Sequence, residues 1–323
     1  MRAVVCTAYG PPESLTIREE PDPVPGPGEV VVDVQAAAVN FPDVLLVADR
    51  YQVHAPLPFT PGSEFAGVVA AAGPGVAAPL PGTAVSGVVM TGAFAQKVLV
   101  PASAVVPLPP GADPVVAAGT AVTHGTAYSA LRSVAAVAPG EWVAVTGAAG
   151  GVGSAAVVLA RALGARVLAV VSTAAKAAFC TEVGADAVLD LSATADVKEG
   201  VRSLTDGGTD VVLDVVGGGL AETLLRTLRP GGRFVTVGFA SGTIPCIPLN
   251  LVLLKDVAVL GFEIRSFPAH HPELAARDAA ELAALHAGGI GATVTARYPL
   301  DGVVEALRLV ADRRALGKLV LTP

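Results

Sequence analysis

The stretch that decides the fold is WVAVTGAAGGVG, which spans residues 142–153. Its first five residues are apolar or β-branched and predict a buried strand, and an apolar helical pattern continues from its end to Leu163. In the turn between them, Gly150 would let the backbone approach a pyrophosphate, and Gly153 would let the helix pack closely on the strand. The order of strand, glycine-rich turn and helix therefore predicts a dinucleotide site at the start of the helix.

This turn departs from the usual G-x-G-x-x-G pattern at one position, where Ala148 replaces the first glycine. A flexible turn without a ligand is the alternative interpretation. The strands and helices that follow favour the dinucleotide site, because the turn then opens a βαβ unit. The residues expected against the phosphates are Ala149, Gly150, Gly151 and Val152.

Strands alternate with helices through the middle of the chain, which predicts an α/β fold with a parallel sheet. The predicted strands are residues 142–146, 166–171, 187–191, 210–215, 233–237 and 257–262. The predicted helices between them are residues 152–163, 174–183, 196–204 and 220–228, with Gly164, Gly184 and Gly231 as C-terminal caps. We expect a doubly wound, six-stranded Rossmann domain.

The chain on either side of this region has a different pattern. Up to about Pro110, short alternating strands are interrupted by Pro and Gly, which predicts a small β-rich domain. After the sixth strand we expect helices at residues 272–287 and 302–313, and then a strand at 318–321 that returns to the first domain. The expected boundaries are residues 1–120, 121–260 and 261–323.

Composition excludes several classes of function. The 323 residues carry 21 basic and 28 acidic side chains without a basic cluster, which argues against a nucleic-acid partner. No signal peptide and no apolar run of membrane-spanning length is present, so we expect a cytoplasmic protein that does not enter a membrane. The three cysteines form no C-x-x-C pair, which excludes a disulfide framework and a structural zinc site.

The end of the second predicted strand indicates which cofactor binds. No Asp or Glu lies between Arg161 and Glu182, whereas Ser172 and Lys176 offer a hydroxyl and an ammonium. These groups suit the 2′-phosphate of NADPH, while a carboxylate would suit the free ribose of NADH. The alternative is a solvated helix lysine beside an N-capping serine.

Five motifs, at residues 39–43, 61–67, 147–153, 214–218 and 317–321, together carry a resemblance to a known family. The chain resembles the zinc-free medium-chain dehydrogenases/reductases, and within them the NADPH:quinone oxidoreductase branch that includes zeta-crystallin. This resemblance implies a GroES-like catalytic domain made from both chain ends, a Rossmann sheet with strand order 3-2-1-4-5-6, and a homodimer that pairs through the edge strand 257–262.

The resemblance also implies that no zinc is bound. Zinc-dependent relatives have Cys, His and Cys where this chain has Asn40, Ser63 and a position near Val122. None of these three side chains is a usual zinc ligand. We therefore expect no metal site and no alcohol oxidation through a metal alkoxide.

The resemblance assigns roles to further residues. Asn40 and Thr126 would lie by the nicotinamide and its ribose, with Asp43 at the same end of the cleft and Tyr51 lining the substrate pocket. Two tyrosines of some relatives, one in the pocket and one at the 2′-phosphate, are Leu45 and Leu191 here. The residues at family positions for cofactor contacts are Lys176, Gly217, Phe239 and Lys318.

Alternatives stay open for several of these residues. Asn40 could be a plain turn residue, Asp43 a structural carboxylate paired with an arginine, and Tyr51 either a hydrogen-bond donor or only a wall of the pocket. The neighbouring His124 is more typical of a structural histidine.

The expected reaction is hydride transfer from NADPH to a quinone or an α,β-unsaturated carbonyl such as an enal or enone. The alternatives are an enoyl-thioester reductase of a lipid or polyketide pathway and a non-catalytic, crystallin-like protein that binds NADPH.

Overall fold

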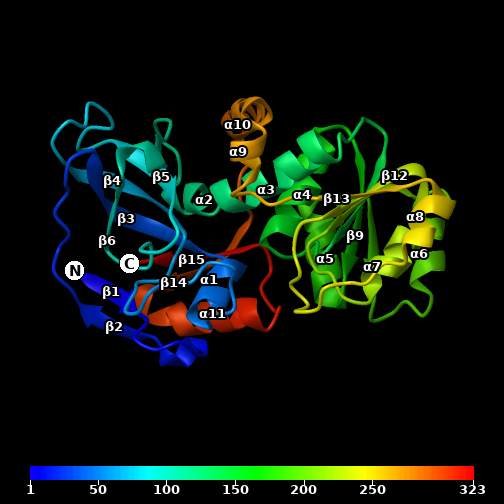
Figure 1. Ribbon diagram of the computed structural model, residues 1–323, viewed down its shortest axis with the longest axis horizontal. Coiled ribbons are helices and arrows are strands. Elements are labelled where there is room, and N and C mark those ends of the chain that lie inside the picture. The colour runs from blue at the N-terminus through cyan, green and yellow to red at the C-terminus, as the bar shows by residue number, and fades with distance from the viewer. The chain divides into compact units, whose positions relative to one another are not determined.

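The computed structural model describes residues 1–323, which divide into two compact units (Figure 1). Unit 1 combines residues 1–122 with residues 292–323, and unit 2 comprises residues 123–291. None of the helices has both the length and the apolar character needed to cross a membrane.

Unit 2 is built on a six-stranded parallel sheet with helices on both faces (Figure 1). The strand order β10-β9-β8-β11-β12-β13 confirms the predicted 3-2-1-4-5-6 order. Every residue of β8 is buried, as expected for a central strand of a covered sheet. The strands are β8 (Trp142–Thr146), β9 (Arg166–Val171), β10 (Ala187–Asp190), β11 (Thr209–Asp214), β12 (Leu228–Thr236) and β13 (Ala258–Gly261).

The predicted helices of unit 2 are all present, but α7 is shorter than predicted, and α3, α8 and α9 were not predicted. Helix α7 ends at Leu225 because Leu228 already belongs to β12, and Gly231, predicted as a helix cap, lies within that strand. Gly184 does cap α5 with a left-handed backbone. The helices are α4 (Gly151–Ala162), α5 (Ala174–Val183), α6 (Val197–Leu204), α7 (Leu220–Leu225), α8 (Leu249–Lys255), α9 (Phe267–His270) and α10 (Pro272–Ala287), preceded by α3 (Ala121–Ser129) and a π-helical turn (Ala130–Val134).

Helix α10 clusters with unit 2, so the second division of the chain falls after residue 291 and not after residue 260 as expected. Side chains on α10 explain this difference. Glu281 accepts hydrogen bonds from Tyr128 Oη at 2.7 Å and from Arg132 Nε at 2.9 Å, and Asp278 bonds Ser133. These contacts join α10 to α3 and the π-helical turn, which the apolar periodicity of the sequence does not reveal.

Unit 1 contains a seven-stranded sheet and a two-stranded sheet. The closing strand β15 pairs antiparallel with β3, so the prediction that it returns to the first domain is confirmed. The large sheet has the order β14-β15-β3-β4-β5-β7, with β6 also paired to β3. Its strands are β3 (Glu29–Val39), β4 (Glu64–Ala72), β5 (Ala84–Val88), β6 (Lys97–Pro101), β7 (Val105–Pro107), β14 (Val294–Pro299) and β15 (Lys318–Thr322), and the small sheet pairs β1 (Arg2–Val5) with β2 (Thr16–Glu19).

Three helices complete unit 1, and its core joins both parts of the chain. Phe65 and Phe94 from the first part pack in one buried cluster with Leu307 and Leu321 from the second. The helices are α1 (Phe41–Val47), α2 (Pro114–Ala118) and α11 (Val303–Ala311).

Candidate functional site

The glycine-rich turn of unit 2 lies at the carboxyl end of β8. A side chain at Gly153 would place its Cβ 2.1 Å from the Gly147 carbonyl oxygen, so helix α4 can approach the turn only because this residue is glycine. Gly150 is the N-cap of α4 and supplies no side-chain cap. The first N–H groups of α4 therefore have no partner within the helix and are available to an anion.

The neighbouring strand β11 ends in a turn that Asp214 holds in place. Asp214 Oδ1 accepts hydrogen bonds from Thr146 Oγ1 at 2.6 Å and from the N–H groups of Val216 and Gly217 at 3.1 and 3.0 Å. Strands β8 and β11 are adjacent and parallel, but the chain continues from β8 toward β9 on one side of the pair and from β11 toward β12 on the other. The turns after β8 and β11 therefore mark the topological switch point of the sheet, where dinucleotides bind. Asp214 was not among the predicted site residues, although its motif was noted.

Gly217 and Phe239 come together at this switch point. Gly217 has a left-handed backbone with φ of 68°. A Cβ there would lie 2.9 Å from Phe239 Cδ1, so the ring covers the turn because no side chain intervenes. Phe239 is 39% exposed, which leaves part of its ring for contact with a ligand.

Ser172 and Lys176 form the predicted pair after β9. Lys176 Nζ donates to Ser172 Oγ at 3.1 Å on the exposed surface, and Thr173 caps α5 by accepting from the Lys176 N–H at 3.4 Å. The N-cap is therefore Thr173 and not Ser172, which leaves the Ser172 hydroxyl and the Lys176 ammonium on the same surface. A hydroxyl beside an ammonium is a suitable site for a phosphate monoester.

Thr126 and His124 are buried side chains of α3. The His124 ring packs edge-on against His286 of α10, with ring centroids 5.5 Å apart, and its Nδ1 lies 3.3 Å from Thr123 Oγ1. Burial lowers the pKa of His286, which favours a neutral imidazole there. This packing agrees with the structural interpretation of His124.

In unit 1, Asn40 and Asp43 meet at the start of α1. Asn40 is the N-cap, and its N–H donates to Asp43 Oδ2 at 2.8 Å. Asp43 is buried and forms no ion pair with an arginine, so the alternative of an arginine-paired carboxylate is wrong. Its Oδ1 is buried without a hydrogen bond of normal geometry, although the nearby Ser63 hydroxyl and Lys318 charge favour its ionised form. Burial outweighs these effects and raises the pKa of Asp43 to about 7.

Sequence reasoning missed the charged partners of Asn40. Lys318 Nζ donates to Asn40 Oδ1 at 2.7 Å and lies 3.6 Å from Glu64 Oε2. Glu64 in turn accepts from Asn40 Nδ2 at 3.2 Å and from the Val122 N–H at 2.8 Å. Both charged side chains are fully buried, and burial raises the pKa of Glu64 and lowers that of Lys318 against their mutual attraction.

The three positions that carry zinc ligands in zinc-dependent relatives lie around this cluster. Asn40 Nδ2 is 3.4 Å from Ser63 Oγ, and Val122 presents only its backbone. An amide, a hydroxyl and a valine do not form a zinc site, and the Lys318 ammonium already supplies a positive charge there. The residues present do not fit a zinc ion.

Tyr51 lies half-buried in the loop that follows α1. A chain of hydrogen bonds holds this loop, because His54 Nδ1 is 2.8 Å from Asp49 Oδ1 and His54 Nε2 is 2.9 Å from Tyr9 Oη. Tyr9 also donates to the Ala55 carbonyl at 2.7 Å. The structure thus brings Asn40, Asp43 and Lys318 into one cluster of unit 1. Tyr51 lies on the loop after α1, which the hydrogen bonds of His54 and Tyr9 hold in place.

Comparisons with known proteins agree with this arrangement. Residues 26–110 match the family model "Alcohol dehydrogenase GroES-like domain", and residues 151–281 match "Zinc-binding dehydrogenase". The chain is 34% identical over 325 residues to "Quinone oxidoreductase-like protein 2 homolog" of Nematostella vectensis, covering 99% of this chain and 88% of that protein. The chain belongs to the quinone oxidoreductase branch of the medium-chain dehydrogenases/reductases.

Solved structures place this quinone oxidoreductase family member among oxidoreductases over its whole length. A mycobacterial protein complexed with NADPH is 34% identical with a TM-score of 0.90, and both chains are covered completely. The quinone oxidoreductase from Thermus thermophilus, also described in complex with NADPH, is 34% identical with a TM-score of 0.86 and complete coverage of both chains. A further relative is a phthioceranic/hydroxyphthioceranic acid synthase of Mycobacterium bovis, 33% identical over 92% of this chain but only 14% of the synthase.

Proposed function

We propose that this protein is an NADPH-dependent reductase of quinones or α,β-unsaturated carbonyls that works without zinc. The observation that carries the cofactor assignment is the 3.1 Å contact between Lys176 Nζ and Ser172 Oγ after β9. The NADPH complexes of its relatives support the same cofactor. The pyrophosphate would bind at the start of α4, and Gly217 and Phe239 would contact the cofactor beyond it.

The bound nicotinamide supplies hydride transfer, so the protein's part is to position and to stabilise charge. Reduction of a conjugated carbonyl places negative charge on its oxygen, which needs a hydrogen-bond donor and then a proton. We propose that Tyr51 offers its hydroxyl to this oxygen and that Thr126 and Asn40 lie by the nicotinamide. Lys318 donates to the side-chain oxygen of Asn40, and Glu64 accepts from its side-chain nitrogen, so these two bonds fix the orientation of the Asn40 side chain.

Asp43 is the best-placed group of unit 1 to exchange a proton near neutral pH, because its pKa is about 7. It is fully buried, so a proton could leave only through its neighbours. We propose that Asp43 acts on the site through Asn40 and Ser63.

One observation favours a second candidate reaction. The similarity to part of a phthioceranic/hydroxyphthioceranic acid synthase is consistent with reduction of an enoyl thioester. The conjugated carbonyl of an enoyl thioester needs the same hydrogen-bond donor and proton as that of an enone. The two candidates differ in the acceptor and not in the cofactor.

We also propose a homodimer that pairs through β13. This strand ends the sheet, and its residue Val259 is 43% exposed. An apolar sheet edge left open is an aggregation hazard, and a second copy would cover it.

The decisive experiment is steady-state NADPH oxidation with 1,2-naphthoquinone, enals, enones and enoyl thioesters. Turnover of a quinone or enone supports the first candidate, and turnover of enoyl thioesters alone supports the second. Oxidation of a simple alcohol with NADP⁺ while every conjugated acceptor fails would refute the reaction class. Tight NADPH binding without any turnover would favour a non-catalytic, crystallin-like binding protein.

The same assay tests Tyr51. If its hydroxyl donates to the developing oxyanion, Tyr51→Phe should lower kcat by roughly 100-fold with little change in NADPH affinity. A change confined to KM would instead mean that Tyr51 only lines the pocket.

A further inference from the structure

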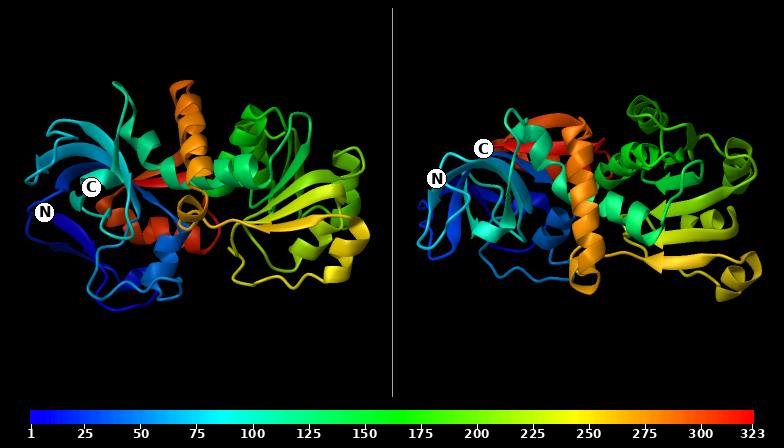
Figure 2. Two further views of the ribbon diagram at one scale, coloured as in Figure 1. Left: turned by 45° about the horizontal axis from the view of Figure 1, so that its top comes forward. Right: turned by 90° about the horizontal axis from the view of Figure 1, so that it is seen from above.

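The loop between α1 and β4 is anchored at its two ends but not in its middle. The segment after β1 provides both anchors: the Gly10 N–H donates to the Val47 carbonyl at 2.9 Å. Further along the loop, Cys6 exchanges two backbone hydrogen bonds with Phe59, at 2.8 and 3.1 Å. Residues 51–58 form no backbone–backbone hydrogen bond, so the position of this part depends on side-chain contacts. Both segments belong to unit 1 and are drawn in shades of blue in Figure 2.

Tyr9, Asp49 and His54 form a clasp across the middle of the loop. His54 Nδ1 lies 2.8 Å from Asp49 Oδ1, and this contact closes a short stretch of chain that contains Tyr51. His54 Nε2 lies 2.9 Å from Tyr9 Oη, which donates to the Ala55 carbonyl at 2.7 Å. The clasp therefore fixes the stretch around Tyr51 to the same segment that anchors the ends of the loop.

The complete clasp requires a doubly protonated His54. The Tyr9 hydroxyl has one hydrogen, which it donates to the Ala55 carbonyl, so Oη can only accept from His54 Nε2. Desolvation and the charge of Asp49 raise the pKa of Tyr9, so the hydroxyl keeps this hydrogen near neutral pH. A carboxylate also only accepts, so His54 Nδ1 must donate to Asp49. Both ring nitrogens therefore carry a hydrogen, and the imidazole is a cation.

Loss of one proton from His54 removes one hydrogen bond from the clasp. A neutral imidazole has a single N–H, so it can donate to Asp49 or to Tyr9 but not to both. Tyr9 could turn its hydrogen toward the ring instead, but the Ala55 carbonyl would then lose its donor. The His54 side chain is 64% exposed and can exchange protons with water. Asp49 and Tyr9 are the titratable groups that face the ring, and Cys6 acts on Tyr9 from the same segment.

We propose that Tyr9, Asp49 and His54 are positioning residues, which hold Tyr51 at the acceptor site while His54 is a cation and release it when His54 is neutral. The proposal rests on the proposed function through the role of Tyr51, and it adds a control by pH that lies outside the cofactor site. Acceptor binding is then favoured on the acid side of the His54 titration, because a loop that is already ordered loses less conformational freedom on binding.

Limited digestion with trypsin measures the clasp without an activity assay. Arg50 is exposed within the clasped stretch, and cleavage after it requires the loop to open. At each pH the cleavage rate of the full-length protein is divided by that of a synthetic peptide of residues 45–57. Between pH 6 and pH 8.5 this ratio should rise roughly 2- to 10-fold, the effect of one net hydrogen bond. Tyr9→Phe and His54→Ala should give the higher ratio at both pH values.

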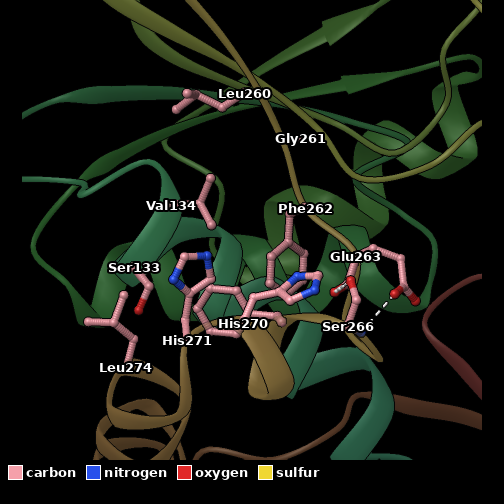
Figure 3. A pocket seen from close by; sticks show the side chains of 11 residues that line it. Ser133, Val134, Leu260, Gly261, Phe262, Glu263, Ser266, His270, His271 and Leu274 are labelled. Atoms are coloured by element: carbon pink, nitrogen blue, oxygen red, sulfur yellow. Dashed lines mark hydrogen bonds between the residues drawn. The ribbon is translucent and has the colours of Figure 1, made fainter.

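Two matched controls separate the clasp from general effects of substitution and pH. Tyr298→Phe removes the hydroxyl of a half-buried tyrosine on β14 of the same unit. His270→Gln removes a histidine that lines a hollow of unit 2 (Figure 3). Both variants should keep the wild-type pH dependence of cleavage after Arg50. Asp43, whose pKa is about 7, is present in every protein compared, so its contribution cancels.

A double-mutant cycle tests the link between the clasp and Tyr51. With an acceptor that the wild-type enzyme reduces, Tyr9→Phe should lower kcat/KM by roughly 2- to 10-fold and leave NADPH affinity unchanged. In a Tyr51→Phe background the same substitution should have little further effect, because no hydroxyl remains to be positioned. A purely structural role would lower kcat/KM equally in both backgrounds.

Two results would overturn the proposal. The first is a wild-type cleavage ratio that does not change with pH, or that Tyr9→Phe leaves unchanged. The second is an equal effect of Tyr9→Phe on kcat/KM in both backgrounds, which would show that the clasp does not act through Tyr51. If no acceptor is reduced, the proposed function fails, whereas the digestion still shows whether the clasp opens with pH.

Discussion

Lys176 is the residue on which the cofactor preference depends. We expect Lys176→Ala to weaken NADPH binding by roughly 1.5–3 kcal/mol, the contribution of a charged hydrogen bond, and to leave NADH binding unchanged. Fluorescence titration with both cofactors measures this difference. Lys198→Ala on α6 is the matched control and should change neither affinity. Equal affinities of the wild-type protein for NADPH and NADH would contradict the assignment.

Asp43 makes stability depend on pH in an unusual direction. Its folded pKa of about 7 lies above that of an unfolded Asp, so the folded state holds the proton more tightly. The stabilisation is complete below the unfolded pKa and is lost as pH rises toward and through 7. Between pH 5 and pH 8 the wild-type protein should lose roughly 2–3 kcal/mol of unfolding free energy that Asp43→Asn does not lose.

Urea denaturation of both proteins at several pH values checks this expectation. Asp312→Asn, which changes an exposed carboxylate after α11, should keep the wild-type pH dependence. Parallel curves for the wild-type protein and Asp43→Asn would show that Asp43 does not carry the buried proton.

For single residues, the sequence predicted which side chains belong to the candidate site better than it predicted their hydrogen-bond and ion-pair partners. Ser172 and Lys176 are close in the chain, and their contact could be expected from one helical turn. Lys318 and Asn40 are 278 positions apart, and their contact exists only because β15 pairs with β3. A lysine in a closing strand gives no local sign that it will be buried, so the ion pair with Glu64 could not be predicted.

At the scale of elements, two glycines of the α4 turn should respond differently to the same change. Gly150→Ala places its Cβ 3.4 Å from the nearest atom, so the fold should tolerate it, but the methyl group would stand where the pyrophosphate approaches. Gly153→Ala meets a backbone oxygen at 2.1 Å and should cost roughly 1–3 kcal/mol of stability.

Thermal unfolding and NADPH titration of both variants separate the two effects. We expect Gly150→Ala to lose NADPH affinity at nearly wild-type Tm and Gly153→Ala to lose Tm. Gly219→Ala, where nothing lies within 4 Å, is the control for both measurements. Unchanged NADPH affinity in Gly150→Ala would remove the pyrophosphate from this turn.

Elements with one clear pattern were predicted well. The bounds of β8, β9, α5 and α10 agree with the predicted ranges because apolar periodicity and turn residues coincide there. The end of α7 was predicted too late because Leu228 fits a helix face and a strand equally well. In the structure Leu228 pairs with Thr209 of β11 and belongs to β12. The placement of α10 depends on the Glu281 contacts, which lie outside any periodic pattern.

For the whole molecule, we expect no stoichiometric zinc. The cluster of Asn40, Ser63 and Glu64 includes the Lys318 ammonium, which would repel a divalent ion. Elemental analysis of the purified protein should find far less than one zinc per chain, and prolonged dialysis against a chelator should leave NADPH oxidation unchanged. Activity that is lost to the chelator and restored by zinc would contradict this prediction.

The pairing of β15 with β3 also sets the order in which the protein can be completed during translation. In the sequence, unit 2 comes between the two parts of unit 1, so the ribosome makes all of unit 2 after residue 122 and before Lys318. At ordinary elongation rates this interval lasts roughly 10 to 40 s. Throughout it, β3 lacks its neighbour β15, and Glu64 lacks the ammonium that neutralises it. Unit 2 can fold while it waits, but the nascent unit 1 must be kept from aggregating until its last strand leaves the exit tunnel.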